Sequence, residues 1–411
     1  MKTPMTTPPN KAELQHLADQ CVKCGMCLPH CATYAISQNE NESPRGRISL
    51  AQGLLQKAIE PQSKALEHLD HCLNCRACEN ICPSGVDFAH LINNVRGNNG
   101  QRSALYKKLA PYFEHPARLA KLHKLALLYQ YSGVQKLVRL SGIINLLGLT
   151  KFDRTLPQLS FNTKLESKIK SAQPTARGQV ILFKGCVARY FDTLTLQSAA
   201  RILSHLGYEI QIPEEQTCCG ALHLHHGDLD VFNELAQKNT SCFNKSPNAP
   251  VISCASGCGA TLLEYHRHGQ VIENEIQDIS TFILKHLNQA KLTFKPYPKR
   301  IGIHDPCTLK NVMKAAQAPH QLLKHIPNAE IVALPDNHHC CGAAGSYNLE
   351  FPEISDAIVA KKLKAIENAG VDVIVSSNIG CQLHLQNHLK QAGMNIPIYH
   401  PVTLLNRLLN A

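Results

Sequence analysis

Apolar residues recur at helical spacing through the first quarter of the chain. Pro44 is followed by such a set, which predicts a helix that begins near the proline; its members are Ile48, Leu50, Ala51, Leu54, Leu55 and Ala58. Similar patterns predict helices from Ser63 to Asp70 and from Val86 to Val95. Residues 93–103, NNVRGNNGQRS, are rich in Gly and Asn, which predicts that the helical pattern ends in this segment.

Residues 104–148 keep the helical pattern, with Leu-rich faces between basic residues. The basic positions are Lys107, Lys108, Arg118, Lys121, Lys124, Lys136 and Arg139. A basic amphipathic stretch can lie on an anionic membrane. It can also be a connecting helix pair whose apolar side packs on neighbouring domains, and both interpretations stay open on the sequence.

The rest of the chain alternates short β-branched runs with helical stretches. The runs form two sets of three and predict strands: QVILFKG, EIQIPEEQT and PVISCASG, then RIGIHDP, EIVALPDNHH and DVIVSSNIG. Alternating strands and helices imply parallel sheets, and the two sets imply a tandem repeat. We therefore predict an α+β protein in which an all-α N-terminal domain precedes a duplicated α/β domain. The expected boundaries are 12–98, 99–178, 179–290 and 291–411.

Composition and charge indicate what kind of protein this is and which cellular compartment it occupies. The 411 residues, 44 % of them hydrophobic, can bury sizeable cores, and the first residues contain no apolar signal segment. No run approaches 18 apolar residues, so no transmembrane helix is expected. The 18 cysteines then fit metal ligands in a reducing cytoplasm better than a disulfide framework. The net charge of +11 allows an acidic surface or partner, including the inner face of the cytoplasmic membrane, but no motif supports nucleic acid.

The first candidate metal-binding motif is Cys-x2-Cys-x2-Cys-x3-Cys, which occurs twice. This spacing holds three thiolates on one cubane 4Fe–4S cluster and sends the fourth to the other cluster. Cluster one is expected to take Cys21, Cys24, Cys27 and Cys82, and cluster two Cys72, Cys75, Cys78 and Cys31. Structural zinc uses separated Cys-x2-Cys pairs, so we favour a helical two-cluster ferredoxin over zinc or disulfides.

A second set of cysteines follows the predicted strands. Because ligands in parallel sheets gather at the carboxyl ends of strands, each half is expected to bring four thiols together; these are Cys186, Cys218, Cys219 and Cys258, then Cys307, Cys340, Cys341 and Cys381. Glycines beside them are expected to supply positive φ or close approach, namely Gly220, Gly257, Gly342 and Gly380. Two alternatives stay open: thiols that are only buried apolar groups, and a structural zinc held by four cysteines.

Histidines accompany these cysteines. They are His223, His225 and His226 in the first half and His304, His338 and His339 in the second. Metal ligation and proton delivery to a quinone are roles open to them, beside ordinary surface or hydrogen-bonded positions. The sequence identifies no catalytic residue, and no G-x-G-x-x-G motif follows a strand to open a helix as in a nicotinamide or flavin site.

The motifs together resemble one family. CVKCGMCLPHC, DHCLNCRACENICPSG, CCGALHLHHG, HDPCTLKN and HHCCGAAGSYNLEFPE are similar to segments of the glycolate oxidase iron–sulfur subunits. These belong to a wider set with paired CCG domains. That set includes a heterodisulfide reductase subunit, lactate-utilisation iron–sulfur proteins and a subunit of anaerobic glycerol-3-phosphate dehydrogenase. The resemblance runs over nearly the whole chain.

This resemblance implies an electron-transfer subunit of an oxidoreductase with two 4Fe–4S clusters and one further iron–sulfur or zinc centre in the CCG domains. FAD-binding partner subunits would oxidise glycolate to glyoxylate, and electrons would pass toward the membrane quinone. The alternatives are a catalytic CCG-type reductase, a subunit for another 2-hydroxy acid such as lactate, and a non-redox scaffold with structural metal.

Two departures from the family pattern matter. Ala32 follows Cys31 where the family usually has proline. Complete CCG motifs end in Cys-x2-Cys, but here Ala255 and Asn378 hold the first positions, and Cys254 lies one residue away. We therefore expect at most four thiolate ligands in each half.

Overall fold

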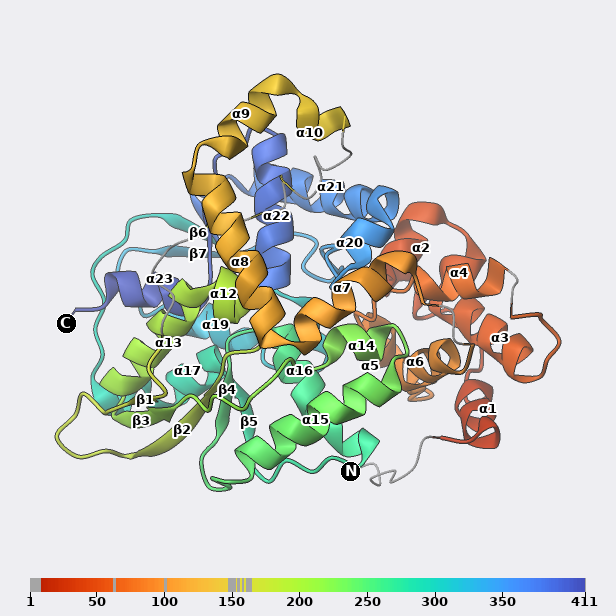
Figure 1. Ribbon diagram of the computed structural model, residues 1–411, viewed down its shortest axis with the longest axis horizontal. Helices are drawn as coiled ribbons and strands as arrows, with labels where there is room; N and C mark the ends of the chain where they lie inside the picture. The colour runs from red at the N-terminus through yellow and green to blue at the C-terminus, as the bar shows by residue number, and fades with distance from the viewer. Residues whose placement is uncertain are drawn as a thin grey trace.

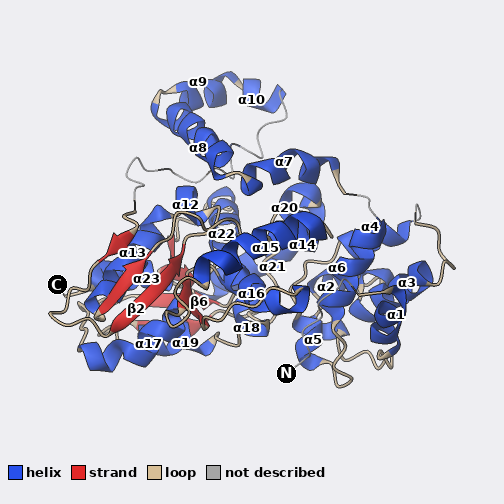
Figure 2. Cartoon of the chain, turned by 60° about the horizontal axis from the view of Figure 1, so that its bottom comes forward, coloured by secondary structure: helices blue, strands red, loops and turns tan. Residues whose placement is uncertain are grey.

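The chain folds into a helical N-terminal domain, a helical connector and two α/β halves, as Figures 1 and 2 show for the computed structural model. The structure describes residues 9–61, 64–99, 102–146, 153, 156, 159 and 165–410. The expected fold class, an all-α domain followed by duplicated α/β domains with parallel strands, is confirmed.

The N-terminal domain is built from short helices around one apolar core. Leu14, Leu69, Leu91 and Ile92 are fully buried in it. The helices are α1 (Lys11–Asp19), α2 (Ala32–Ser37), α3 (Pro44–Leu55), α4 (Lys64–Asp70), α5 (Ala77–Ile81) and α6 (Phe88–Asn99), with 3-10 turns η1 (Leu28–His30) and η2 (Glu40–Glu42). Helix α3 begins at Pro44, as predicted, because Ser43 caps it by accepting from Gly46 N. The predicted start of α4, Ser63, lies outside the described residues.

The predicted break after Val95 is wrong. Helix α6 continues to Asn99, and the side chains of Asn94 and Asn99 donate to the carbonyls of His90 and Val95 within the helix. Gly97 is there for packing: a Cβ on it would lie 2.9 Å from the carbonyl oxygen of Gly227. Close approach to the first α/β half, rather than a helix end, explains this glycine.

The connector projects from the body of the molecule (Figure 2). It consists of α7 (Ala104–Glu114), α8 (Pro116–Tyr131), α9 (Val134–Ser141) and α10 (Ile143–Leu146). The last predicted residues, 147 and 148, lie outside the described part. Within the described residues, no helix is long and apolar enough to cross a membrane.

The two α/β halves repeat one topology. The first sheet has the order β1-β3-β2-β4-β5 and the second β7-β6-β8-β9; all pairs are parallel except β1 with β3. The strands are β1 (Lys168–Ile169), β2 (Gly178–Phe183), β3 (Tyr208–Gln211), β4 (Val251–Ser253), β5 (Ile276–Asp278), β6 (Arg300–His304), β7 (Glu330–Ala333), β8 (Val373–Ser376) and β9 (Ile398–Tyr399). All six predicted runs are strands.

Helices separate these strands. In the first half they are α12 (Ala188–Phe191), α13 (Thr193–His205), α14 (Ala221–His225), α15 (Leu229–Phe243), α16 (Ser256–Glu264), η3 (Tyr265–His268) and α17 (Ile279–Ala290). In the second they are α18 (Cys307–Asn311), α19 (Gln317–Leu323), α20 (Tyr347–Glu350), α21 (Pro352–Ala369), α22 (Ile379–Gln391) and α23 (Pro401–Leu408). One core joins both halves, with Val180, Ile252, Ile301 and Val375 buried together. The four domain boundaries stay predictions.

Candidate functional site

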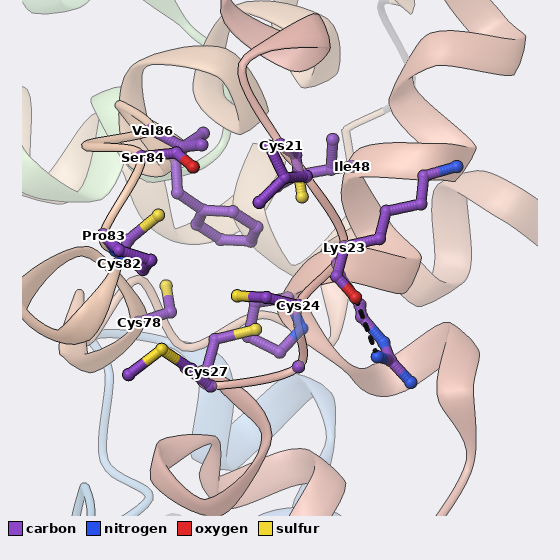
Figure 3. A pocket seen from close by; sticks show the side chains of 16 residues that line it. Cys21, Lys23, Cys24, Cys27, Ile48, Cys78, Cys82, Pro83, Ser84 and Val86 are labelled. Carbon is purple, nitrogen blue, oxygen red and sulfur yellow. Dashed lines mark hydrogen bonds between the residues drawn. The ribbon is translucent and has the colours of Figure 1, made fainter.

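The first ferredoxin loop gathers sulfur around one cavity. Figure 3 shows the sulfurs of Cys21, Cys24, Cys27 and Cys82 directed toward a shared space, and Cys78 lines the same cavity. The loop winds tightly because Lys23 and Gly25, on either side of Cys24, have φ of 53° and 81°. Sulfurs that face one space are a donor set that a cubane cluster fits.

The second loop repeats this geometry beside the first. Cys31, Cys72, Cys75 and Cys78 line the second cavity, and Asn74 and Arg76, on either side of Cys75, have φ of 50° and 60°. The fourth cysteine of each motif thus lies with the other motif's loop, which is the arrangement that cross-ligation requires. The cluster-by-cluster ligand assignment stays a prediction.

A buried arginine, which the sequence interpretation missed, lies behind the second cavity. Arg47 is 1 % exposed, and its Nη1 lies 3.9 Å from Cys31 Sγ. It pairs with buried Glu42 at 2.5 Å, and Glu42 also contacts His68 and His71. The positive charge stabilises negative charge on nearby thiolates. The signal in the sequence was the run SPRGRISL at the start of α3, whose second arginine is Arg47.

The first cavity opens to the surface. Cys24 is exposed, and the neighbouring apolar side chains of Val22 and Met26 are 69 % and 50 % exposed. A cluster in this cavity would therefore lie at the edge of the molecule, within reach of a partner protein.

The second cavity instead faces the α/β halves. Cys75, Cys307 and Cys340 pack in one apolar cluster. Burial raises the pKa of Cys75, and the charge of Cys307 raises it further. The two kinds of cysteine site are therefore neighbours.

The first α/β half brings its four predicted thiols together. Cys186 follows β2, Cys218 and Cys219 precede α14, and Cys258 lies in the first turn of α16. Hydrogen bonds from the thiols of Cys218 and Cys258 lower the pKa of Cys219 well below its ordinary value. One thiolate therefore forms readily in this group.

The second half repeats the arrangement. Cys307 Sγ lies 3.8 Å from Cys340 Sγ, and Cys340, Cys341 and Cys381 are buried. A hydrogen bond to Cys340 and burial raise the pKa of Cys307. Densely packed buried thiols favour a cation that compensates their negative charge once they ionise.

All eight thiols line one cavity of about 420 Å³ between the halves. Asn74 and Arg76 of the second ferredoxin loop also reach it. Cys254 also lines this cavity but packs in the shared core, and burial followed by the charge of Asp278 raises its pKa. The arrangement can hold one metal centre in each half, with both centres facing one shared cavity.

The glycines beside the thiols divide into two kinds. Gly220 and Gly342 have φ of 83° and 93°, as expected, and a Cβ on Gly220 would meet Phe232 at 2.6 Å. The positive φ expected at Gly257 and Gly380 is wrong, because they lie in the first turns of α16 and α22, and their close approach to a metal centre stays a prediction.

The singled-out histidines of the first half make specific contacts. His223 Nδ1 lies 2.7 Å from Tyr106 OH of the connector, and His226 Nε2 lies 2.9 Å from Glu350 of the second half. His225 lines the large cavity, and burial lowers its pKa to about 3.

The histidines of the second half differ from one another. His339 Nε2 donates to the carbonyl of Pro29 in the first ferredoxin loop at 3.0 Å. His338 is about half exposed beside Asp336. His304 lies beside the thiols of its half. A functional role for any of them stays a prediction.

Comparisons with known proteins give matches in the ferredoxin domain, the connector and both α/β halves. The family model of a 4Fe-4S dicluster domain matches residues 17–86, that of the linker region of glycolate oxidase iron-sulfur subunits 102–156, and that of a cysteine-rich domain 180–263 and 301–386. A relative from Bacillus subtilis (strain 168), described as a probable glycolate oxidase iron-sulfur subunit, is 33 % identical over 91 % of this chain and 90 % of its own length.

Two further relatives extend the likeness. The glycolate oxidase iron-sulfur subunit of Escherichia coli (strain K12) is 29 % identical, with 91 % of each chain covered. A dihydromethanophenazine:CoB–CoM heterodisulfide reductase subunit from Methanosarcina barkeri is 26 % identical over 94 % of this chain and 93 % of its own length. Full-length likeness to subunits of oxidoreductases shows that the whole arrangement, not one domain, is shared.

Proposed function

Because the chain belongs to the family of glycolate oxidase iron–sulfur subunits, we propose that it carries electrons from a partner flavoprotein toward the membrane quinone. The partner oxidises glycolate to glyoxylate at FAD, and this chain is a subunit of that oxidoreductase. The observation that carries the proposal is the contact between the second ferredoxin loop and the second half, where Cys75 packs with Cys307 and Cys340.

The proposed cofactors follow the sulfur geometry. Two 4Fe–4S clusters are held by Cys21, Cys24, Cys27 and Cys82 and by Cys72, Cys75, Cys78 and Cys31. The surface position of Cys24, with Val22 and Met26 exposed beside it, supports cluster one as the contact point for the partner. Cluster two then connects this point to the interior of the α/β halves.

Four thiolates in each half are proposed ligands of further metal centres, because four thiols converge in each half. When bound, such a centre accepts and gives up electrons if it contains iron, or fixes the fold if it is zinc. The chain's own part is to hold the ligands in place and away from the outer surface, since Cys218, Cys219, Cys340, Cys341 and Cys381 are all buried.

A second candidate function has its own observation. The cavity of about 420 Å³ between the two halves is lined by thiols of both. Direct reduction of a quinone or a disulfide in this cavity is the second candidate, because the thiols of both halves would face the bound molecule there. This alternative keeps the ferredoxin domain as the source of electrons.

The connector supports a peripheral place on the membrane. Leu125, Leu128, Leu137 and Leu140 are 63, 65, 67 and 86 % exposed. Glu114 is the only acidic residue in residues 104–146, and Lys121, Lys124 and Lys136 are exposed. Exposed leucines among lysines match an anionic lipid surface, because the leucines can enter the headgroup boundary while the lysines meet lipid phosphates.

The proposal is tested by reconstitution. The isolated chain should not oxidise glycolate with any dye acceptor, whereas the chain with its FAD-binding subunits should reduce a quinone analogue with glycolate. Lactate and glycerol 3-phosphate as substrates test the alternatives. Turnover by the isolated chain without flavin would contradict the electron-transfer role, and preference for another substrate would contradict only the choice of glycolate.

A further inference from the structure

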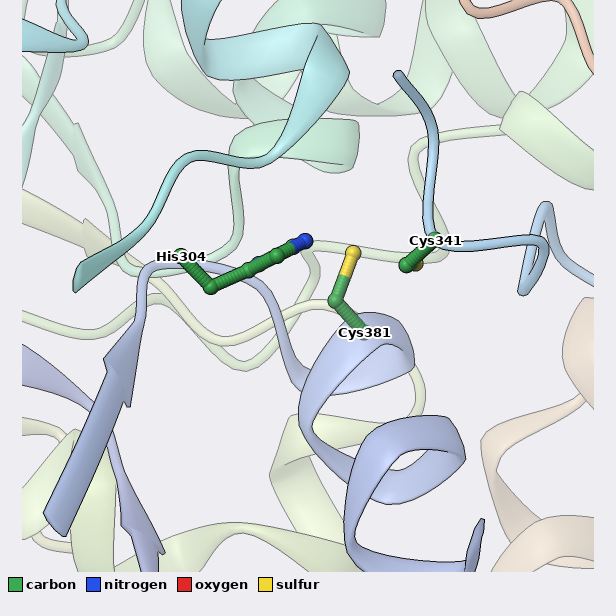
Figure 4. A group of neighbouring side chains, drawn as sticks. All are labelled: His304, Cys341 and Cys381. Carbon is green, nitrogen blue, oxygen red and sulfur yellow. The ribbon is translucent and has the colours of Figure 1, made fainter. Parts of the chain in front are cut away.

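The last residue of β6 brings a nitrogen to the sulfurs of the second half. His304 is 2 % exposed, and one of its ring nitrogens, Cys341 Sγ and Cys381 Sγ all lie within 4.8 Å of one another. Figure 4 shows the ring directed from the strand end toward the sulfur of Cys381. The three groups come from different segments, namely β6, the loop before α20 and α22.

The two ring nitrogens have different surroundings. Nδ1 lies 2.9 Å from Ser376 Oγ on the neighbouring strand β8. Nε2 is buried and has no hydrogen-bond partner among the described residues. A buried polar atom left without a partner costs about 1–3 kcal/mol, and a metal ion bound at Nε2 would remove this cost.

The first half lacks this nitrogen. Phe183 ends β2 three residues before Cys186, as His304 ends β6 three residues before Cys307. The partners on the adjacent strand also match, because Phe183 pairs with Ser253 and His304 with Ser376. An imidazole at this strand-end position is therefore a feature of the second half, whereas His225 of the first half lines the cavity from α14.

We propose that Nε2 of His304 is a ligand of the metal centre in the second half, beside the thiolates of Cys341 and Cys381. The inference rests on the proposed function, which gives that centre its thiolate ligands. Metal-binding histidines usually bond through the second ring nitrogen to a fixed oxygen, and Ser376 Oγ has this place. Mixed sulfur and imidazole ligands suit both zinc and iron–sulfur centres.

The asymmetry has a redox consequence. Where His304 takes the place of one of the four thiolates on the metal, a neutral ligand replaces a negative one, and histidine in place of cysteine raises the potential of an iron–sulfur centre. An iron centre in the second half would then accept electrons more readily than a sulfur-only centre in the first half. The second half is also the one that packs against Cys75.

The test uses the full chain, purified without oxygen from cells grown with 15N-labelled histidine or with unlabelled histidine. Iron, acid-labile sulfide and zinc are measured, and pulsed EPR of the reduced protein detects nitrogen bound to a paramagnetic centre. If the second half holds zinc, Co²⁺ exchanged into it gives the same readout. The variants are His304→Phe, which copies the first half, and His304→Cys, which offers a thiolate instead.

The expected result is a strong nitrogen coupling that changes with the isotope and disappears in both variants. His304→Phe should lose metal from the second half, and His304→Cys should regain it with a lower potential if the metal is iron. Ser253→Ala is the matched control and should leave the coupling unchanged. The two cubane spectra should persist in every variant, which shows that the chain still folds.

Other outcomes separate the two proposals. A centre in the second half with no nitrogen coupling, and with metal content unchanged in His304→Phe, overturns the histidine ligand and leaves the proposed function intact. Parent protein with cubane iron and no other metal overturns the centres of both halves, and His304 with them.

Discussion

The side-chain amide of Asn311 donates a 2.7 Å hydrogen bond to the backbone carbonyl of Cys75. Asn311 ends α18, the helix that begins with Cys307, so this bond ties a proposed ligand segment of the second half to the second ferredoxin loop. The next residue of that loop, Arg76, pairs with Glu264 of the first half. The loop is thus fixed against both halves, which holds the proposed redox centres at constant separation.

The first prediction concerns cluster two. Cys75→Ser should remove the EPR signal and the iron of one cubane and leave the other, because the proposed ligands of cluster one are untouched. Iron analysis and EPR of anaerobically purified protein measure this. Cys242→Ser is the control, since Cys242 is a buried cysteine outside every proposed ligand set. Protein that holds zinc but no iron would refute the ferredoxin assignment.

Much of the fold could be predicted because the chain's local patterns are strong. The β-branched runs predicted six of the strands, and alternation with helices predicted that these strands are parallel. The strands β1, β5 and β9 have two or three residues and no cysteine motif after them, whereas β4, also of three residues, was recognised because Cys258 follows it in the repeat. Helix α6 was ended too early because Gly97 fits a contact with Gly227, which no local pattern records.

One part of the candidate site could also be predicted from the sequence, and another part could not. Cysteine spacing indicated the thiols that line each cavity, since the spacing itself shapes the loop. Arg47 and Glu42 were not recognised, because their pairing depends on burial by α4, which places His68 and His71 around them. Charge compensation of this kind arises only in the packed structure.

The second prediction concerns this buried pair. Arg47→Gln should lower the stability of the chain by up to about 3–5 kcal/mol, because buried Glu42 loses its arginine partner and keeps only His68 and His71. It should also make the potential of cluster two more negative, since a positive charge near Cys31 is lost. Thermal unfolding and a redox titration followed by EPR measure the two effects.

Two further variants separate stability from potential. The double variant Arg47→Gln with Glu42→Gln should recover much of the stability. Arg45→Gln breaks a more exposed pair with Glu40 and should cost only about 0–1 kcal/mol. If Arg47→Gln changes neither unfolding nor potential, the arginine has no electrostatic role at the cluster.

The third prediction concerns the connector. The chain should bind vesicles that contain anionic lipid at low salt, and binding should weaken as salt rises, since charges are screened over about 8 Å at physiological ionic strength. Leu137→Ser with Leu140→Ser should reduce binding, because both side chains are exposed and apolar. Leu194→Ser changes an exposed leucine of α13 and should leave binding unchanged. Absence of vesicle binding at low salt, or equal binding to neutral vesicles, would argue against a membrane contact.

The last prediction asks whether the thiols of the two halves take part in electron transfer. Cys219→Ser and Cys341→Ser should each lower quinone reduction by the assembled complex and reduce the metal beyond the cubanes, while both cubane spectra remain. Cys219→Ser is the more informative variant. Hydrogen bonds from Cys218 and Cys258 favour the thiolate of Cys219, and serine cannot supply that negative charge at neutral pH. Cys254→Ser is the control, since Cys254 lines the same cavity but packs in the shared core.

Full electron transfer and unchanged metal in both variants would mean that these cysteines only support the fold. Loss confined to Cys341→Ser would instead place the working centre in the second half, next to Cys75.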